Sequence, residues 1–135
     1  MPPPNYAHVA DGLHRSGFPN ELNFLFLERL RVKTIVFLRG EVPDRFFLDW
    51  INDQGIDLVL LDPFPAAPRQ AIIHRTKHAT ISEETVLAAL DVILDSSRYP
   101  VLVMCNSGRG KTGIVIGCLR KVMRWNVTSI FEEYR

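Results

Sequence analysis

The chain has 135 residues, with 16 Lys and Arg against 15 Asp and Glu, and 47% of its residues are hydrophobic. This length favours a single domain with a sizeable core, and the apolar fraction argues against a mainly disordered chain. The net charge of +1 excludes the broad basic surface that nucleic acid requires. The apolar runs are far shorter than the ~20 residues of a spanning helix, so membrane insertion is not expected.

The two cysteines are too few for a disulfide framework, and residues 1–4 lack the basic and apolar stretches of a secretory signal. We therefore expect a cytoplasmic protein. Residues 1–12 lack periodicity and are expected to form an N-terminal arm, followed by a single domain over residues 13–135.

Short apolar runs predict buried strands, and amphipathic periodicity with capping residues predicts helices. A strand end or turn is expected at 14–17, and strands are expected at 34–38, 57–61 and 101–104. Helices are expected at 20–30, at 44–54, after a capping box at 80–83, at about 111–125 and after a second capping box at 129–132.

This alternation of strands and helices predicts an α/β fold. We expect a central, mostly parallel sheet of about four to five strands flanked by helices. Ligands of such sheets bind beyond the carboxyl ends of the strands. The turn that follows residues 101–104 and the Pro-rich loop at 62–69 both come after such ends, so both are expected to face the same crevice.

The segment VLVMCNSGRGKTG at residues 101–113 carries the strongest chemical signal. A buried strand ends, a glycine-rich turn follows, and a helix begins, so backbone N–H groups and the positive end of the helix dipole point at one spot. Such a nest binds a phosphate-sized anion. The predicted phosphate-binding residues are Asn106, Ser107, Gly108, Arg109, Gly110, Lys111 and Thr112.

Three interpretations of this turn are open. In the first, the thiolate of Cys105 attacks phosphorus and forms a phosphocysteine while the turn holds the phosphate oxygens. In the second, Gly110-Lys111-Thr112 ends the nucleotide-binding motif G-x-x-x-x-G-K-[ST], but Cys105 replaces the first glycine of that motif. In the third, the turn only reverses the chain. The combination of glycines, cations, hydroxyls and a cysteine favours the first interpretation.

Four further motifs accompany the turn: RSGFP at 15–19, LRVKTI at 30–35, GCLRK at 117–121 and SIFEEY at 129–134. Together with the turn they resemble the atypical dual-specificity phosphatases of plants and fungi, whose loop is C-x-x-G-K-H-R-T-G. That family is a branch of the cysteine-dependent phosphatases, whose signature is H-C-x5-R-[ST]. The resemblance implies a phosphatase that needs no metal or cofactor. It also implies phosphotyrosine-like substrates or the β-phosphate of inositol pyrophosphates.

Three positions depart from the family pattern. Lys111 stands at the signature arginine, and its point charge lacks the planar fork that holds two phosphate oxygens at once. Met104 replaces the usual histidine before the nucleophile, and Arg109 stands at the family's lysine position. We therefore expect phosphate binding to be retained and turnover to be reduced.

Asp62 follows the strand at 57–61, where a general acid would stand. The alternative role of Asp62 is to hydrogen-bond its own turn. Cys118 is expected to be a buried core thiol, and the scattered histidines do not make a zinc site.

Two functions follow from these observations. The first is a cysteine phosphatase in which Cys105 is the nucleophile, Lys111 replaces the arginine and Asp62 is the acid. Its substrate would be a phosphorylated small molecule, preferably an inositol pyrophosphate, or a phosphoprotein. The alternative is a weak or inactive module that binds phosphate or inositol polyphosphates and acts through partners. The oligomeric state is not predicted.

Overall fold

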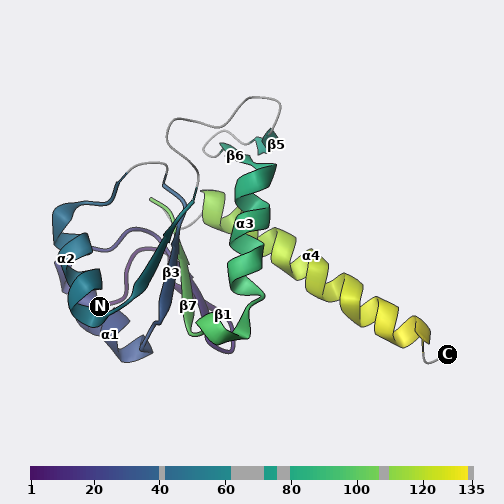
Figure 1. The fold of residues 1–135 in the computed structure, drawn as a ribbon, viewed down its shortest axis with the longest axis horizontal. Coiled ribbons are helices and arrows are strands. Elements are labelled where there is room, and N and C mark those ends of the chain that lie inside the picture. Colours follow the sequence, from purple (N-terminus) through teal and green to yellow (C-terminus); the bar gives the residue numbers. More distant parts are fainter. Residues whose placement is uncertain (40–41, 62–71, 76–79, 107–109, 134–135) are drawn as a thin grey trace.

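The computed structural model describes residues 1–39, 42–61, 72–75, 80–106 and 110–133 (Figure 1). Its centre is a five-stranded sheet in the order β1-β2-β7-β3-β4. The strands are β1 (Ala7–Ala10), β2 (Leu13–Ser16), β3 (Thr34–Phe37), β4 (Asp57–Leu60) and β7 (Val101–Met104). All neighbours are parallel except β1, which is antiparallel to β2. The predicted fold class is therefore confirmed, with β7 in the middle of the sheet.

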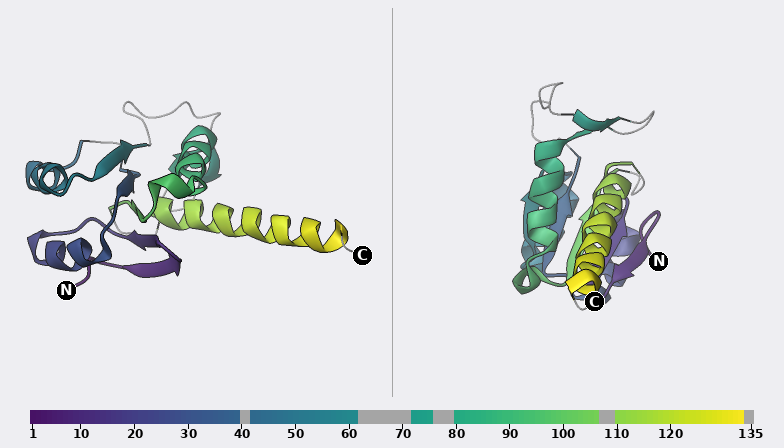
Figure 2. Two further views of the ribbon diagram at one scale, coloured as in Figure 1. Left: turned by 60° about the horizontal axis from the view of Figure 1, so that its bottom comes forward. Right: turned by 90° about the vertical axis from the view of Figure 1, so that its right-hand side faces the viewer.

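Helices cover both faces of this sheet (Figure 1). One face carries α1 (Phe24–Leu30), which follows a short 3₁₀ turn, η1 (Glu21–Asn23), and α2 (Arg45–Gln54). The other face carries α3 (Glu83–Ile93) and α4 (Gly110–Glu133), which contact each other. A 3₁₀ turn, η3 (Ser96–Arg98), leads from α3 into β7. Figure 2 shows that α4 continues well past the sheet.

The central strand β7 has no solvent-facing side. Val101 and Val103 belong to the core cluster beneath α3 and α4, whereas Leu102 and Met104 belong to the cluster beneath α1 and α2. All four side chains are fully buried. Burial on both faces explains why this strand is an unbroken apolar run, as expected of a parallel sheet between two helix layers.

Most predicted elements lie where the sequence places them. The strands expected at 34–38, 57–61 and 101–104 are β3, β4 and β7, and the helix expected at 44–54 is α2. Gly55 ends α2 in the left-handed conformation, with φ of 66°. Asn20 caps the helical segment before α1 through its side chain, which accepts a hydrogen bond from the Leu22 N–H at 2.9 Å.

The N-terminal segment differs from the expected arm because residues 7–10 form the edge strand β1. Ala7 pairs with Arg15, and the Gly17 N–H donates to the Pro4 carbonyl at 2.7 Å. The sequence AHVA is short and half exposed, so it lacks the apolar run that marks a buried strand.

Two predicted helix starts were wrong. The cap of α3 is Ser82, whose hydroxyl accepts a hydrogen bond from the Thr85 N–H at 3.1 Å, and Thr80 lies in β6 (Thr80–Ser82), which pairs with β5 (Ile72–Arg75). The capping box expected at 129–132 does not open a new helix, because α4 runs through to Glu133. The sequence after Gly117 contains no Gly or Pro as far as Glu133, so nothing stops the helix earlier.

Within the described residues, no helix is both long and apolar enough to cross a membrane.

Candidate active site

Cys105 follows β7 directly and therefore stands at the carboxyl edge of the sheet, between two parallel neighbours. Met104 pairs with Ser16 of β2 on one side and with Phe37 of β3 on the other. The Leu38 N–H donates to the Met104 carbonyl at 2.9 Å, so the chain after β3 still follows the chain after β7. Only 5% of Cys105 is exposed. The sheet thus buries the proposed nucleophile and presents it at the end of its central strand.

The chain after β2 holds the beginning of the turn. The Phe18 N–H donates to the Asn106 carbonyl at 3.1 Å. The Phe18 ring is fixed in turn by Phe37 and Phe47, with centroid distances of 5.8 and 5.0 Å. Asn106 itself is exposed. The RSGFP motif at 15–19 therefore forms one wall of the site and anchors the first residue after the cysteine.

The helix that follows the turn begins at Gly110, so Lys111 and Thr112 lie in its first turn. The first N–H groups of a helix lack intrahelical partners and carry the positive end of its dipole, which favours an anion there. Lys111 is half-buried, and Thr112 is fully buried. The Thr112 hydroxyl has no hydrogen-bond partner among the described residues. This end of α4 is therefore built from groups that suit a bound anion.

Arg15 of β2 brings a second cation to the same helix turn. Its Nη2 lies 3.6 Å from the position that a Cβ atom on Gly113 would occupy. A Cβ atom there would make an ordinary van der Waals contact with the guanidinium, so Arg15 lies directly beside the first turn of α4. The first residue of the RSGFP motif is thus placed beside the predicted phosphate site.

Some predicted site residues lie outside the described residues. These are Ser107, Gly108 and Arg109 of the turn, together with Asp62. Their roles stay predictions. The structure brings Cys105, Asn106, Gly110, Lys111 and Thr112 to one edge of the sheet, in the strand–turn–helix order that the sequence predicts.

The second cysteine packs against the core, but it is less buried than the core thiol that the sequence predicts. Cys118 is half-buried against the core cluster beneath α3 and α4, and it forms no disulfide with Cys105. Among the described residues, no group of three His, Cys, Asp or Glu side chains gathers where a metal ion would bind.

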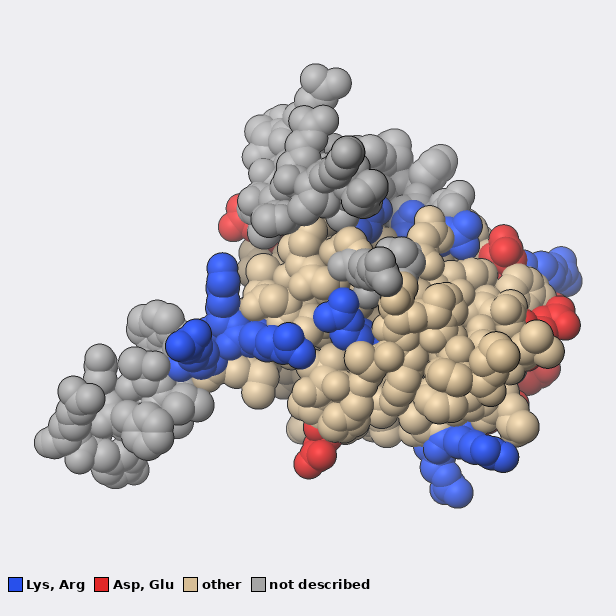
Figure 3. All heavy atoms as spheres, turned by 180° about the vertical axis from the view of Figure 1, so that it is seen from behind, with Lys and Arg blue, Asp and Glu red and all other residues tan. Residues whose placement is uncertain are grey.

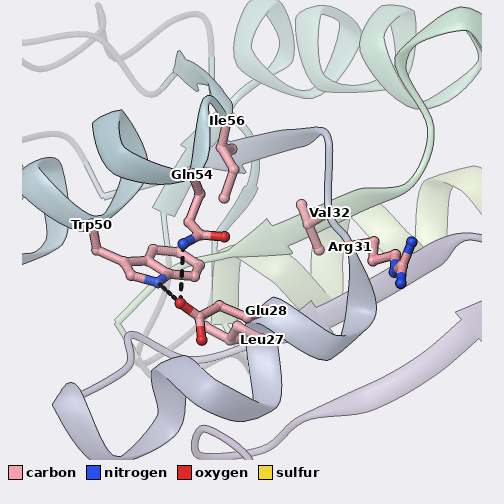
Figure 4. Close-up of a pocket in the computed structure, with 7 residues that line it drawn as sticks. All are labelled: Leu27, Glu28, Arg31, Val32, Trp50, Gln54 and Ile56. Carbon is pink, nitrogen blue, oxygen red and sulfur yellow. Dashed lines mark hydrogen bonds between the residues drawn. The ribbon is translucent and has the colours of Figure 1, made fainter.

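A cavity of about 330 Å³ lies at the opposite edge of the sheet (Figure 4). Two of its lining residues, Val32 and Ile56, come just before β3 and β4, so it faces the amino ends of these strands. Its wall includes Glu28, whose Oε1 accepts hydrogen bonds from Trp50 Nε1 at 3.4 Å and Gln54 Nε2 at 3.0 Å. The wall carries the cation Arg31 as well as Glu28, but the cavity lies at the edge of the sheet away from Cys105, so it is not part of the predicted phosphate site.

Positive charge is concentrated on the elements that carry the site. Residues 96–131 contain six Lys and Arg and no Asp or Glu. Figure 3 shows basic side chains along the described part of α4, while the acidic side chains lie elsewhere on that face. The exposed cations of α4 are Arg120, Lys121 and Arg124. The overall charge of +1 therefore conceals a local excess that suits an anionic substrate.

Sequence analysis missed Arg39, which follows β3 at the same edge of the sheet. Its guanidinium carbon lies 4.9 Å from the centroid of the Phe18 ring. The available signal was its position immediately after a predicted buried strand, where the chain reaches the ligand-binding edge.

A cysteine at the end of the central parallel strand, followed by a helix that begins beside it, defines a cysteine-phosphatase-like fold. Comparison with known proteins agrees, because the whole chain, residues 1–135, matches the tyrosine phosphatase family. The chain belongs to that family.

Individual relatives extend this similarity. The chain is 50% identical over 135 residues to the probable tyrosine-protein phosphatase DG1060 of Dictyostelium discoideum, covering all of this chain and 76% of that protein. It is 38% identical over 137 residues to inositol diphosphatase DSP4 of Arabidopsis thaliana, covering all of this chain and 64% of that protein. The structure resembles the core catalytic domain of the PP-IP phosphatase SIW14 from S. cerevisiae. That match has a TM-score of 0.77 and 34% identity, and it covers all of this chain and 76% of the other.

Proposed function

We propose that this protein is a cysteine-dependent phosphatase that removes the β-phosphate of an inositol pyrophosphate, at a rate limited by Lys111. The observation that carries the proposal is the buried Cys105 between the end of β7 and the first turn of α4. Two similar proteins, named as an inositol diphosphatase and a PP-IP phosphatase, support this choice of substrate over a phosphoprotein.

In the proposed reaction, the thiolate of Cys105 attacks the terminal phosphorus, and the bond from phosphorus to the leaving oxygen breaks. Asp62 donates a proton to that oxygen. Water then attacks the phosphocysteine and gives a proton back to the Asp62 carboxylate, the P–S bond breaks, and inorganic phosphate leaves while the thiolate is restored. The N–H groups of residues 106–111 bind the three phosphate oxygens as their charge grows, and the buried Thr112 hydroxyl donates to the thiolate.

Lys111 supports a second candidate, a module that binds inositol polyphosphates without turning them over. A lysine supplies the positive charge that ground-state binding needs, but it does not supply the paired donors of an arginine. The missing fork affects the transition state more than the bound substrate, because only in the transition state must the three equatorial oxygens be held in a plane.

One experiment separates the two candidates. Phosphate release is measured from an inositol pyrophosphate and from a phosphotyrosine peptide, without added metal, for the wild type, Cys105→Ser and Lys111→Arg. The enzyme proposal expects Cys105→Ser to lose turnover by ~1,000-fold or more. It expects Lys111→Arg to raise kcat/KM by ~10-fold, the gain from one further charge-assisted hydrogen bond.

If the wild type releases no phosphate and Lys111→Arg creates no activity, the enzyme proposal fails. Saturable binding of an inositol polyphosphate in calorimetry would then support the binding module. The absence of such binding would remove the binding module as well.

We also propose that residues 13–135 form a single domain, to which β1 (Ala7–Ala10) of the N-terminal segment adds an edge strand, and that the protein is cytoplasmic. The location is supported by the two free thiols, since the proposed nucleophile acts only in its reduced state. The excess of cations around α4 is short and local, which favours a small anionic substrate over nucleic acid.

A further inference from the structure

Arg39 stands at the rim of the proposed phosphate site. Phe37 pairs with Met104, and the Leu38 N–H donates to the Met104 carbonyl at 2.9 Å. Two residues beyond this pair, the chain from β3 reaches Arg39 and the chain from β7 reaches Asn106. Adjacent parallel strands are about 4.8 Å apart, so the two backbones come close at the carboxyl edge of the sheet.

Phe18 links Arg39 to the turn by two independent contacts. Its N–H donates to the Asn106 carbonyl at 3.1 Å, and its ring lies 4.9 Å from the guanidinium carbon of Arg39. The ring is itself held by three other phenylalanines, with centroid distances of 5.8, 6.0 and 5.0 Å to Phe37, Phe46 and Phe47. The guanidinium is therefore placed on a rigid aromatic surface next to the first residue after the nucleophile.

This placement suits a phosphate-binding group. The face of an aromatic ring attracts a guanidinium and helps to hold it in position. Arginine has five such donors in a planar fork that matches two phosphate oxygens. Arg39 is also half-buried, which strengthens its interaction with an anion relative to a fully solvated side chain.

We propose that Arg39 binds the phosphate adjacent to the one that Cys105 attacks, and thereby makes the site select diphosphates over monophosphate esters. This proposal rests on the proposed function. With the attacked phosphate bound between Cys105 and the first turn of α4, the rest of a diphosphate substrate would extend outward, past Asn106 and toward the rim. In the reaction the adjacent phosphate is the leaving group and gains negative charge, which a guanidinium at the rim stabilises.

The test compares two substrates and four proteins. The substrates are an inositol pyrophosphate and para-nitrophenyl phosphate, which has no second phosphate. The proteins are the wild type, Arg39→Gln, Arg39→Lys and a matched control, Arg29→Gln. Arg29 is an exposed arginine in the last turn of α1, near the amino ends of the strands. Thermal melting of each variant checks that it is folded.

We expect Arg39→Gln to lower kcat/KM for the pyrophosphate by ~10- to 100-fold, the usual effect of losing hydrogen bonds to a charged group, and to leave para-nitrophenyl phosphate within ~3-fold. Arg39→Lys should restore part of the loss, because it returns the charge without the fork. Arg29→Gln should match the wild type on both substrates. An equal loss on both substrates, or no loss on either, in folded Arg39→Gln would overturn the proposal.

A wild type that hydrolyses neither substrate would refute the proposed function but would still leave the role of Arg39 measurable. Calorimetry with inorganic pyrophosphate and with inorganic phosphate then replaces the kinetic assay. Pyrophosphate binding that weakens ~10-fold in Arg39→Gln, with phosphate binding unchanged, supports the proposal. Equal effects on the two anions, or no binding of either by the wild type, overturn it.

Discussion

The turn between β1 and β2 should not tolerate a side chain at Gly12. Gly12 has a φ of 73°, and its carbonyl accepts a hydrogen bond from the Val101 N–H at 2.7 Å, which ties the turn to the start of the nucleophile strand. A Cβ atom on Gly12 would lie 2.9 Å from Cδ2 of Tyr99. The Tyr99 ring cannot move aside freely, because its hydroxyl donates to the Ile93 carbonyl at 2.6 Å.

Two costs therefore add in Gly12→Ala. A left-handed backbone conformation costs an alanine ~1–2 kcal/mol. Moving the Tyr99 ring sacrifices a hydrogen bond worth ~1 kcal/mol. The free energy of unfolding should fall by ~2–3 kcal/mol, which in a domain of this size lowers the Tm by ~6–12 °C.

Gly55→Ala is the matched control. Gly55 has a similar φ of 66°, but a Cβ atom there would meet nothing within 4 Å. Urea unfolding and thermal melting of both variants should show that Gly12→Ala lowers the free energy of unfolding by ~1 kcal/mol more than Gly55→Ala does. Equal losses would refute the contribution of the Tyr99 contact. If neither variant is destabilised, the cost assigned to an alanine in the left-handed conformation is refuted as well.

Two further predictions concern the chain on either side of the site. Burial, and to a lesser degree the nearby His8, lower the pKa of His14. The unfolded chain then binds the proton more readily than the folded protein, so the Tm should fall as the pH drops below ~6.5. Thermal melts between about pH 5 and 8 should show a weaker dependence of the Tm on pH for His14→Gln. An unchanged dependence in that variant would contradict the reasoning. Met104→His restores the family residue, but Met104 is fully buried in an apolar cluster. We expect urea unfolding to show that the free energy of unfolding falls by ~1–3 kcal/mol, because the imidazole is buried among apolar side chains. A free energy of unfolding equal to that of the wild type would mean that the imidazole finds a hydrogen-bond partner.

The buried strands were predictable from sequence because two-sided burial demands an unbroken apolar run. The run at 101–104 is such a case, since all its side chains are fully buried. The edge strand β1 was not predictable in the same way. The side chains of its sequence AHVA are exposed or only partly buried, and its strand conformation depends on pairing with β2. The capping box at 129–132 predicts a new helix, but no helix breaker precedes it, so α4 continues past residue 125.

The same distinction applies to the site. Cys105 and Thr112 belong to one continuous segment, so their relation to the turn follows from local sequence alone. Phe18 and Arg39 reach the turn from two other strands, and only the pairing of β2 and β3 with β7 brings them together. The position of Arg39 after a predicted strand places it at the ligand-binding edge, but residue spacing does not show that it meets Phe18 there.

Lys111 and Arg39 are proposed to act on different phosphates, and this assignment can be tested by combining their substitutions. If each residue holds its own phosphate, their effects on kcat/KM for a pyrophosphate should multiply. The gain from Lys111→Arg would then be the same with Arg39 and with Arg39→Gln, within ~2-fold, as expected for sites without a shared contact.

The competing arrangement places the guanidinium of Arg39 on the attacked phosphate, as a substitute for the arginine that Lys111 replaces. Lys111→Arg would then duplicate a contact that already exists, and its gain would be small in the wild type but large in Arg39→Gln. The wild type, the two single variants Lys111→Arg and Arg39→Gln, and their double variant are also measured on para-nitrophenyl phosphate, which separates the two arrangements further. This monophosphate should be insensitive to Arg39 in the first arrangement and should show the full coupling in the second.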